Sequence, residues 1–149
     1  MAVNRALVGR EYPALRYEVG REKLREFATA LGETAGVYHD EAVARAAGHP
    51  DLPAVPTFAV VLSFRAGQLV YGDPELGLDY SRVLHGEQAF SYQRPVYAGD
   101  RLVVTGRIES VDVKGRHEVL VVATLMRTEG GEPVCQATST IISVGTAVR

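Results

Sequence analysis

The sequence has a single cysteine and no tryptophan among its 149 residues. With only Cys135 available, no disulfide can form within the chain, and this cysteine usage is typical of a reducing compartment. No segment approaches the roughly 20 consecutive apolar residues that a membrane-spanning helix needs. Residues 1–20 contain three arginines and no extended apolar stretch, so we predict no signal peptide. These absences predict a cytoplasmic protein that does not associate with a membrane.

Long runs of charge of one sign are absent as well. The chain carries 16 lysines and arginines against 18 aspartates and glutamates, which gives a formal net charge of −2. Proteins that bind nucleic acid usually carry a basic patch, so we predict no nucleic-acid partner. Hydrophobic residues make up 46% and charged residues 23%, which are ordinary values for a globular chain long enough to bury a core. We predict one domain over residues 1–149.

Motifs of several enzyme classes are missing too. The sequence has neither a glycine-rich phosphate-binding loop nor a nucleophile elbow. His39, Asp40 and His49 do not match the spacing of a zinc site. Cys135 lies within a predicted strand and is interpreted as a small buried hydrophobic residue. We therefore predict no metal and no cofactor.

Helical patterns occupy the first half of the chain. Apolar residues recur at helical spacing over residues 24–31, and Gly32 is placed to end that helix. A second short helix is expected to begin with Asp40 as its N-cap residue and to end at Gly48. Between the two helices, the segment 32–40 (Gly-Glu-Thr-Ala-Gly-Val-Tyr-His-Asp) gathers two acids, a tyrosine and a histidine beside the predicted core. This segment is the first candidate for a functional loop.

The most apolar helix is predicted at residues 56–66. Pro56 suits the first turn of a helix, where its missing N–H would have no partner, and Gly67 marks the expected end. Because the residues between them are apolar on nearly every side, we expect this helix to be buried all round. Residues 66–80 are rich in glycine, aspartate and proline, and are expected to form a loop around a short segment at 69–71.

Strand patterns occupy the second half. Alternating and β-branched residues predict four strands, at residues 90–94, 102–108, 118–128 and 134–144. A further short strand is expected near residues 16–19. Long neighbouring strands with short turns predict an antiparallel meander, and helices before strands predict the α+β class. A sheet that curls around one apolar helix buries every face of that helix, and this arrangement is the hot-dog fold.

Three stretches carry a family resemblance. They are residues 21–64, the segment Leu84-His85-Gly86-Glu87-Gln88, and the segment Arg94-Pro95-Val96-Tyr97-Ala98-Gly99-Asp100-Arg101-Leu102. Together they resemble the MaoC-like, R-specific enoyl-thioester hydratases, and among these the single-hot-dog subunits of actinobacterial 3-hydroxyacyl-ACP dehydratases. The resemblance covers nearly the whole chain. It implies the hot-dog fold and an acyl-CoA or acyl-ACP ligand.

The family's catalytic signature is Gly-Asp-x-Asn-Pro-[Leu/Ile/Val]-His-x-Asp, in which the Asp and His handle the water added to or removed from the double bond. It aligns without a gap on residues 32–40, with Glu33 at the Asp position, Tyr38 at the His position and Ala35 at the Asn position. Glu33 keeps a carboxylate but moves it outward, and a shift of about 1 Å can cost roughly a hundredfold in rate. A phenol, with a usual pKa of about 10, is a poor general base at pH 7. We therefore expect a degenerate pair with little independent hydratase activity.

The resemblance also implies a thioester-binding site at the start of the central helix, over Val55-Pro56-Thr57-Phe58. The N–H groups of Thr57 and Phe58 are expected to be available there to a thioester oxygen. His85 and Gln88 are expected to precede a strand beside the acyl pocket, either as substrate contacts or as structural hydrogen-bonding groups.

Two interpretations remain open for each of two residues near these sites. Tyr38 is either a substrate contact or an aromatic residue of the core or rim. His39 is interpreted as an exposed neighbour of the Asp40 N-cap, and a loop bulge that moves it into the position of the family histidine is the alternative. An acidic carrier protein would favour basic residues near the pocket mouth. The candidates are Arg94, Arg101 and Arg107.

The first functional hypothesis is an acyl-thioester-binding, non-catalytic subunit of an R-specific 3-hydroxyacyl-ACP or -CoA dehydratase. The alternatives are a slow homodimeric hydratase that uses Glu33, helped by Tyr38, His39 or His85, and an acyl-thioester binder or thioesterase unrelated to dehydration. Catalytically complete members of the family generally place two hot-dog units side by side, and an isolated sheet leaves an edge strand open. We therefore predict a homodimer, or a heterodimer with a catalytic hot-dog subunit.

Overall fold

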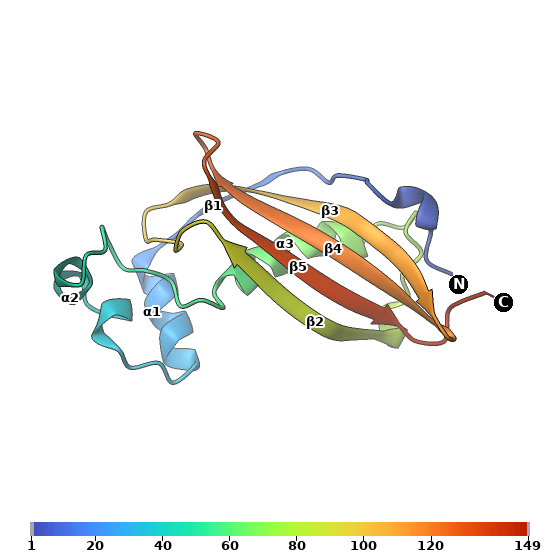
Figure 1. The fold of residues 1–149 in the computed structure, drawn as a ribbon, viewed down its shortest axis with the longest axis horizontal. Coiled ribbons are helices and arrows are strands. Elements are labelled where there is room, and N and C mark those ends of the chain that lie inside the picture. Colours follow the sequence, from blue (N-terminus) through green and yellow to red (C-terminus); the bar gives the residue numbers. More distant parts are fainter. Residues whose placement is uncertain (1, 149) are drawn as a thin grey trace.

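A five-stranded antiparallel sheet forms the body of the protein, which a computed structural model describes over residues 2–148 (Figure 1). The strands are β1 Leu15–Glu18, β2 Val83–Tyr92, β3 Arg101–Lys114, β4 His117–Thr128 and β5 Pro133–Ser143. Their order across the sheet is β1-β3-β4-β5-β2. Of the four strands predicted as a meander, β3, β4 and β5 follow one another as expected. The first of the four, β2, pairs with β5 and not with β3, so that part of the prediction is wrong. The short strand β1 joins beside β3. The sheet is therefore a meander with an earlier strand added at each edge.

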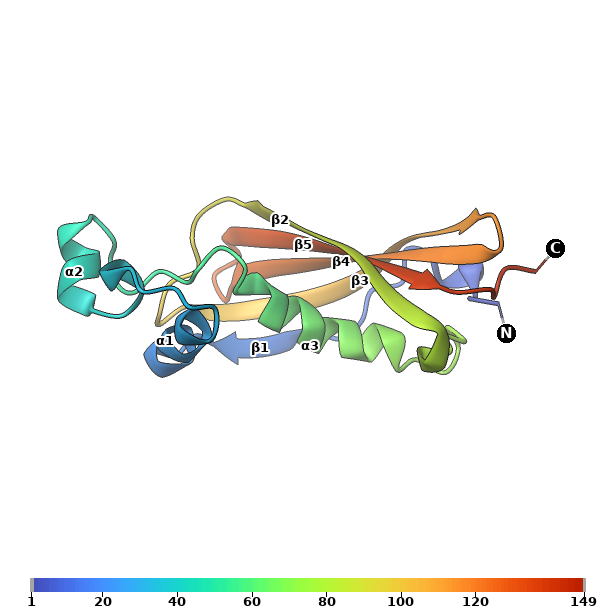
Figure 2. The same cartoon turned by 90° about the horizontal axis from the view of Figure 1, so that it is seen from below.

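Helix α3, Ala59–Tyr71, lies against one face of this sheet (Figure 2). Its side chains Leu62, Ala66 and Val70 are at most 1% exposed. At Gly106 of β3 the helix comes so close that a Cβ would lie 3.4 Å from the carbonyl oxygen of Ala66. The helix and the strand are thus in van der Waals contact at this position. This is the hot-dog arrangement that the hydrophobic pattern predicts.

Two predictions about this helix are wrong. It is not buried all round, because Phe64 is 63% exposed and Leu69 is 38% exposed. It also continues past Gly67 to Tyr71, so residues 69–71 are helical and do not belong to a loop. A Cβ at Gly67 would lie 2.7 Å from Cε2 of Tyr71. The glycine therefore marks a close side-chain contact and not a helix end.

The remaining helical elements are α1 Arg21–Ala30, α2 Glu41–Ala46 and the single 3-10 turns η1 Arg5–Leu7, η2 Gly36–Tyr38 and η3 Tyr80–Arg82. Gly32 ends α1 as predicted, because its φ of +73° lets the N–H of Glu33 donate to the carbonyl oxygen of Ala28 at 2.9 Å. Asp40 caps α2 as predicted, since its carboxylate accepts the N–H of Ala42 at 2.7 Å. Among the helices of residues 2–148, none is both long and apolar enough to cross a membrane.

Strand β2 is longer than the strand predicted at residues 90–94, because it begins at Val83. His85 and Gln88 therefore lie within a strand and do not precede one. β2 pairs with β5 along its length, with a bulge between His85 and Glu87. Its other edge has no strand partner in the described part of the chain.

Candidate functional site

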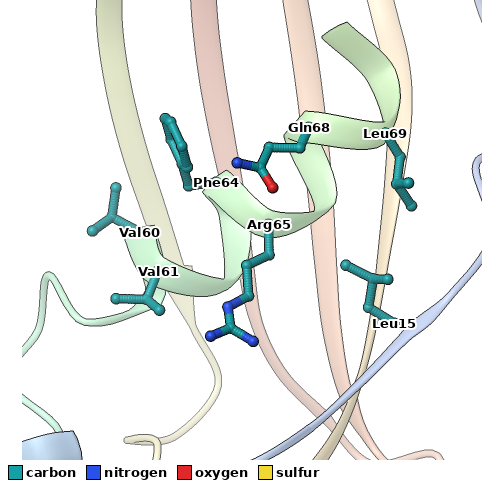
Figure 3. Close-up of a pocket in the computed structure, with 7 residues that line it drawn as sticks. All are labelled: Leu15, Val60, Val61, Phe64, Arg65, Gln68 and Leu69. Atoms are coloured by element: carbon teal, nitrogen blue, oxygen red, sulfur yellow. The ribbon is translucent and has the colours of Figure 1, made fainter. Parts of the chain in front are cut away.

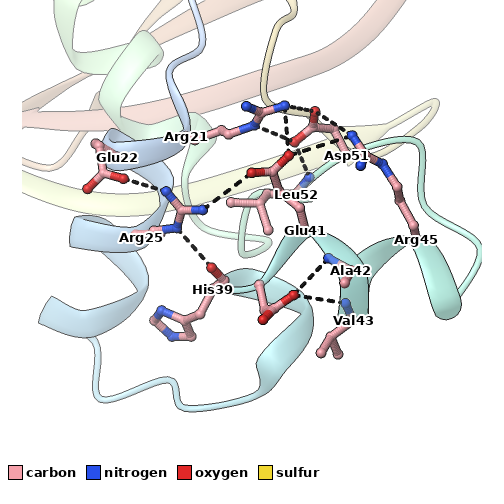
Figure 4. Close-up of polar contacts among 11 residues, drawn as sticks. Arg21, Glu22, Arg25, His39, Glu41, Ala42, Val43, Arg45, Asp51 and Leu52 are labelled. Atoms are coloured by element: carbon pink, nitrogen blue, oxygen red, sulfur yellow. Dashed lines mark hydrogen bonds and ion pairs between the residues drawn. The ribbon is translucent and has the colours of Figure 1, made fainter.

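The loop at residues 32–40 is held by contacts from α1 (Figure 4). Arg25 donates from Nε to the carbonyl oxygen of His39 at 2.8 Å. Arg21 forms a two-pronged pair with Asp51, with N–O distances of 3.1 and 2.8 Å. The hydrogen bonds from Arg21 lower the pKa of the Asp51 carboxyl to about 2, against the opposing effect of burial. These charged contacts hold the loop and the segment that follows α2 against α1.

Glu33 is committed to its own loop. Its Oε1 accepts the N–H of Ala35 at 2.9 Å, and its carbonyl oxygen lies 2.7 Å from Nε2 of His39. The His39 ring is half-buried in this contact, so the prediction of an exposed histidine is wrong. Neither Glu33 nor His39 lines the two cavities described below. The Glu33 carboxylate and the His39 imidazole therefore make hydrogen bonds that stabilise the loop itself.

A cavity of about 330 Å³ lies beside the loop, and Tyr38 lines it. Its other walls come from the segment before α3 and from the end of β2 and the residues that follow it. His49 also lines this cavity, and its Nδ1 lies 3.0 Å from the hydroxyl oxygen of Tyr97. These two residues are 48 positions apart, and no local pattern in the sequence links them. Tyr38 thus faces a cavity, whereas Glu33 does not.

The start of α3 is less open than expected. The N–H of Phe58 donates to the carbonyl oxygen of Val55 at 2.9 Å. The Phe58 ring is fully buried, in an edge-to-face contact with Phe27 at 5.4 Å between ring centres. Phe58 therefore has no N–H to spare, whereas Thr57 is exposed. Of the two amide donors expected at this helix start, the one that remains a candidate is Thr57.

Tyr92 occupies the same helix start, and the sequence pattern indicated no role for it. Its hydroxyl donates to the carbonyl oxygen of Pro56. Burial, together with the nearby Cys135, raises the pKa of Tyr92. The phenol thus bonds a backbone carbonyl at the point where a thioester oxygen is expected.

His85 and Gln88 line a second cavity, of about 210 Å³, between α3 and the strands β2 and β5. Ser63 of α3 and Ser139 of β5 meet there, with 3.2 Å between their hydroxyl oxygens. Ser139 also donates to Oε1 of Gln88 at 2.7 Å. The structure thus brings both predicted substrate contacts into one cavity and adds two serines that no motif indicates.

The outward face of α3 forms an open groove of about 800 Å³ (Figure 3). Val60 and Phe64 line this groove and also line the inner cavity. Figure 3 shows both side chains projecting from the helix on the side away from Leu69 and Leu15. Val60 and Phe64 therefore border both the groove and the inner cavity.

Two of the three arginines considered for carrier binding are paired within the protein. Arg94 donates to both carboxylate oxygens of Asp100, at 2.9 and 3.0 Å. Arg107 pairs with Glu109 at 2.6 Å. The exposed Arg101 is the one for which no ion pair is found within residues 2–148. Arg94 and Asp100, at the two ends of the Arg-Pro-Val-x-x-Gly-Asp segment, thus pair with each other and stabilise the turn between them.

The antiparallel sheet on a central helix defines a hot-dog domain of the MaoC-like dehydratase type. The sequence model described as "FAS1-like, dehydratase domain region" matches residues 6–137, and the chain belongs to this family. The family resemblance stated from the sequence is therefore confirmed.

Particular relatives agree with this assignment. The chain is 47% identical to a UPF0336 protein of Saccharopolyspora erythraea over 148 residues, which cover 99% of this chain and 95% of the relative. It is similar to the C-terminally truncated HadBC (3R-hydroxyacyl-ACP dehydratase) complex of Mycobacterium tuberculosis, with a TM-score of 0.81 and 29% identity over 91% of this chain and 96% of that chain. It is also similar to a protein described as a MaoC-like dehydratase, with a TM-score of 0.86 and 26% identity over 94% of this chain and 43% of that chain.

Proposed function

We propose that this chain is the acyl-thioester-binding, non-catalytic subunit of an R-specific 3-hydroxyacyl-ACP or -CoA dehydratase. The observation that carries the proposal is the Glu33 carboxylate, which accepts the N–H of Ala35 at 2.9 Å and lines neither cavity. The residue at the catalytic Asp position is thus committed to its own turn. Tyr38, at the catalytic His position, faces a cavity but supplies a phenol, which is a poor general base near neutral pH.

The acyl-binding part of the proposal is supported by the cavity between α3, β2 and β5. Val60, Val83 and Ile141 contribute apolar walls, and Gln88 and Ser139 add a few hydrogen-bonding groups. Small-molecule sites usually combine apolar walls with a small number of placed polar groups. Val60 and Phe64 line both this cavity and the outer groove of α3, so we expect an acyl chain to enter from that face.

The partner is expected to be a second hot-dog subunit that carries an intact Asp/His pair. Strand β2 presents an edge without a strand partner in the described residues, and Leu84 on it is 59% exposed. Phe64 and Leu69 are exposed on α3. Proteins usually cover an open strand edge and an exposed apolar helix face. The similar HadBC structure is itself a complex, which supports an assembly of two subunits.

The test is a hydration assay on a short enoyl-thioester, with this chain alone, with a hot-dog chain that carries the intact Asp/His signature alone, and with both together. We expect turnover from the mixture and at least about a hundredfold less from this chain alone, because its carboxylate is displaced and its histidine replaced. Turnover near 10 s⁻¹ from this chain alone, which is an ordinary enzyme rate, would contradict the proposal and favour the homodimeric hydratase.

Matched substitutions assign the chemistry to one subunit. Glu33→Gln keeps an oxygen that can accept the Ala35 N–H, so we expect the mixed complex to retain its kcat within about twofold. The corresponding Asp→Asn change in the partner's signature is expected to abolish turnover. A large loss of kcat from Glu33→Gln in the complex would show that this loop takes part in catalysis.

A further inference from the structure

The cavity between α3, β2 and β5 follows one side of the helix. The residues of α3 that line it are Val60, Ser63, Phe64 and Tyr71. The last three follow Val60 at helical spacing, so all four share one face, and Val60 and Tyr71 lie about 16 Å apart along the axis. Thr57, the candidate donor to a thioester oxygen, is one turn before Val60 and accepts its N–H at 3.1 Å. The thioester end of a bound chain therefore lies near Val60 and its tail points toward Tyr71.

The Tyr71 ring closes the far end of the cavity. Side chains on a helix lean toward its N-terminus, and this ring lies back over Gly67, where a Cβ would be 2.7 Å from Cε2. It also makes an edge-to-face contact with Tyr80, with 6.4 Å between ring centres. Behind it, Tyr71 and Val83 pack against the buried core cluster that contains Ile141. The ring is thus an end wall with the core behind it.

The interior of the cavity suits a plain alkyl chain. Ser63, Ser139 and Gln88 bond one another, with 3.2 Å between the serine oxygens and 2.7 Å from Ser139 Oγ to Gln88 Oε1. The surface left to a ligand is almost wholly apolar. Burial raises the pKa of Tyr71 to about 12, so the end wall is uncharged at neutral pH. A polar group on the chain would lose water there without gaining a partner, which is unfavourable.

We propose that this cavity selects unsubstituted acyl tails and that the Tyr71 ring limits their length. The inference rests on the proposed acyl-thioester binding and names its substrate class. A volume of about 210 Å³ holds about seven methylene groups, each taken as the roughly 30 Å³ of a water molecule. The thioester carbon and the next two carbons, where hydration takes place, stay at the start of α3. The longest chain that fits therefore has about ten carbons.

The dependence of affinity on chain length follows from this shape. Each methylene that enters the apolar cavity tightens binding about fourfold. Once the chain reaches the Tyr71 ring, a further methylene remains in water or has to displace a packed side chain, so it adds no affinity. The affinity is therefore expected to rise with chain length and then to level off. Tyr71 is a specificity-determining residue in this scheme.

The test measures binding by calorimetry to the purified full chain. The ligands are pantetheine thioesters with unsubstituted chains of 4, 6, 8, 10 and 12 carbons, because CoA and acyl carrier proteins share the pantetheine end. Every two carbons should tighten binding about tenfold up to ten carbons, and dodecanoyl-pantetheine should bind no more tightly than decanoyl-pantetheine. In Tyr71→Ala, which removes the end wall, the dodecanoyl ligand is expected to bind about tenfold more tightly than the decanoyl ligand.

Two variants serve as controls. Tyr12 is also a partly buried tyrosine packed against the same core cluster, but it does not line the cavity. Tyr12→Ala therefore removes an equal side chain and should leave the length limit where it is. Tyr71→Phe keeps the ring and is expected to keep the limit. If Tyr71→Ala does not fold, Tyr71→Leu, which is shorter but still apolar, should also let the dodecanoyl ligand bind more tightly than the decanoyl ligand.

The outcomes separate this inference from the proposed function. Affinity that keeps rising to twelve carbons in the unaltered chain, or a limit that stays in place when the Tyr71 ring is removed, would overturn the length selection and leave acyl-thioester binding standing. Binding of none of the five ligands would overturn both. A limit that also moves in Tyr12→Ala or in Tyr71→Phe would overturn the assignment to the Tyr71 ring.

Discussion

Replacing Gly67 with alanine is expected to destabilise the protein, although alanine is the better helix former. In an unhindered helix interior this change stabilises by about 1 kcal/mol. Here the new Cβ would lie 2.7 Å from Cε2 and 3.3 Å from the hydroxyl oxygen of Tyr71. The ring must therefore leave its place in the cavity wall, and displacing a packed side chain typically costs about 1–3 kcal/mol. The balance is a loss of up to about 2 kcal/mol in the free energy of unfolding.

A double-mutant cycle separates the two effects. In a Tyr71→Ala background the clash is absent, so Gly67→Ala is expected to stabilise by about 1 kcal/mol, and the effect changes sign. Urea unfolding followed by circular dichroism gives the four stabilities. All four are measured at one protein concentration, because assembly makes apparent stability depend on concentration. An effect of the same sign and size in both backgrounds would refute the reasoning that the Tyr71 ring requires this glycine.

Two further predictions concern carboxylates. Asp51→Asn should lower stability at pH 7 by up to about 2 kcal/mol. Because Arg21 lowers the Asp51 pKa to about 2, the contribution is present above the unfolded pKa near 4 and is lost as pH falls toward 2. Urea unfolding of the two proteins should therefore converge near pH 2, and a constant difference would contradict this. Glu118→Ala should cost about 2–4 kcal/mol, since the buried carboxylate accepts the Val3 N–H at 2.9 Å and the Thr146 hydroxyl at 2.8 Å. The same assay at pH 7 measures it, and a loss below about 0.5 kcal/mol would count against those bonds.

The parts of the fold that depend on local chemistry could be predicted from the sequence. Gly32 and Asp40 end and begin helices through bonds to residues only a few positions away, so their residue types reveal the element ends. The position of β2 depends instead on pairing with β5, where His85 lies opposite Ile141. Such distant pairing leaves no periodic signal, which is why the predicted strand was too short. The helix end predicted at Gly67 was wrong for a related reason. This glycine is needed for a contact with the aromatic ring of Tyr71 and does not form a turn.

Only part of the candidate site could be predicted from the sequence. Alignment placed Glu33 and Tyr38 in one motif, but hydrogen bonds within the loop decide which side chain faces a cavity. Gln88 and His85 were predicted as substrate contacts, and they do share a cavity. Their polar neighbour Ser139 lies 51 positions from Gln88, and a lone serine within a strand carries no signal of its own. Individual candidate residues could therefore be predicted from the sequence, whereas only the structure shows which of them lie together.

The edge of β2 that has no strand partner within residues 2–148 also bears on how the chain behaves when it is made alone. The ten residues Val83–Tyr92 present one side of a strand, and such an edge can template the addition of further strands and lead to aggregation. The bulge between His85 and Glu87, with the Glu87 charge beside it, interrupts that edge and opposes regular stacking. Co-expression with a hot-dog partner is therefore expected to raise the yield of dispersed protein, and changes that straighten β2 at the bulge are expected to lower it.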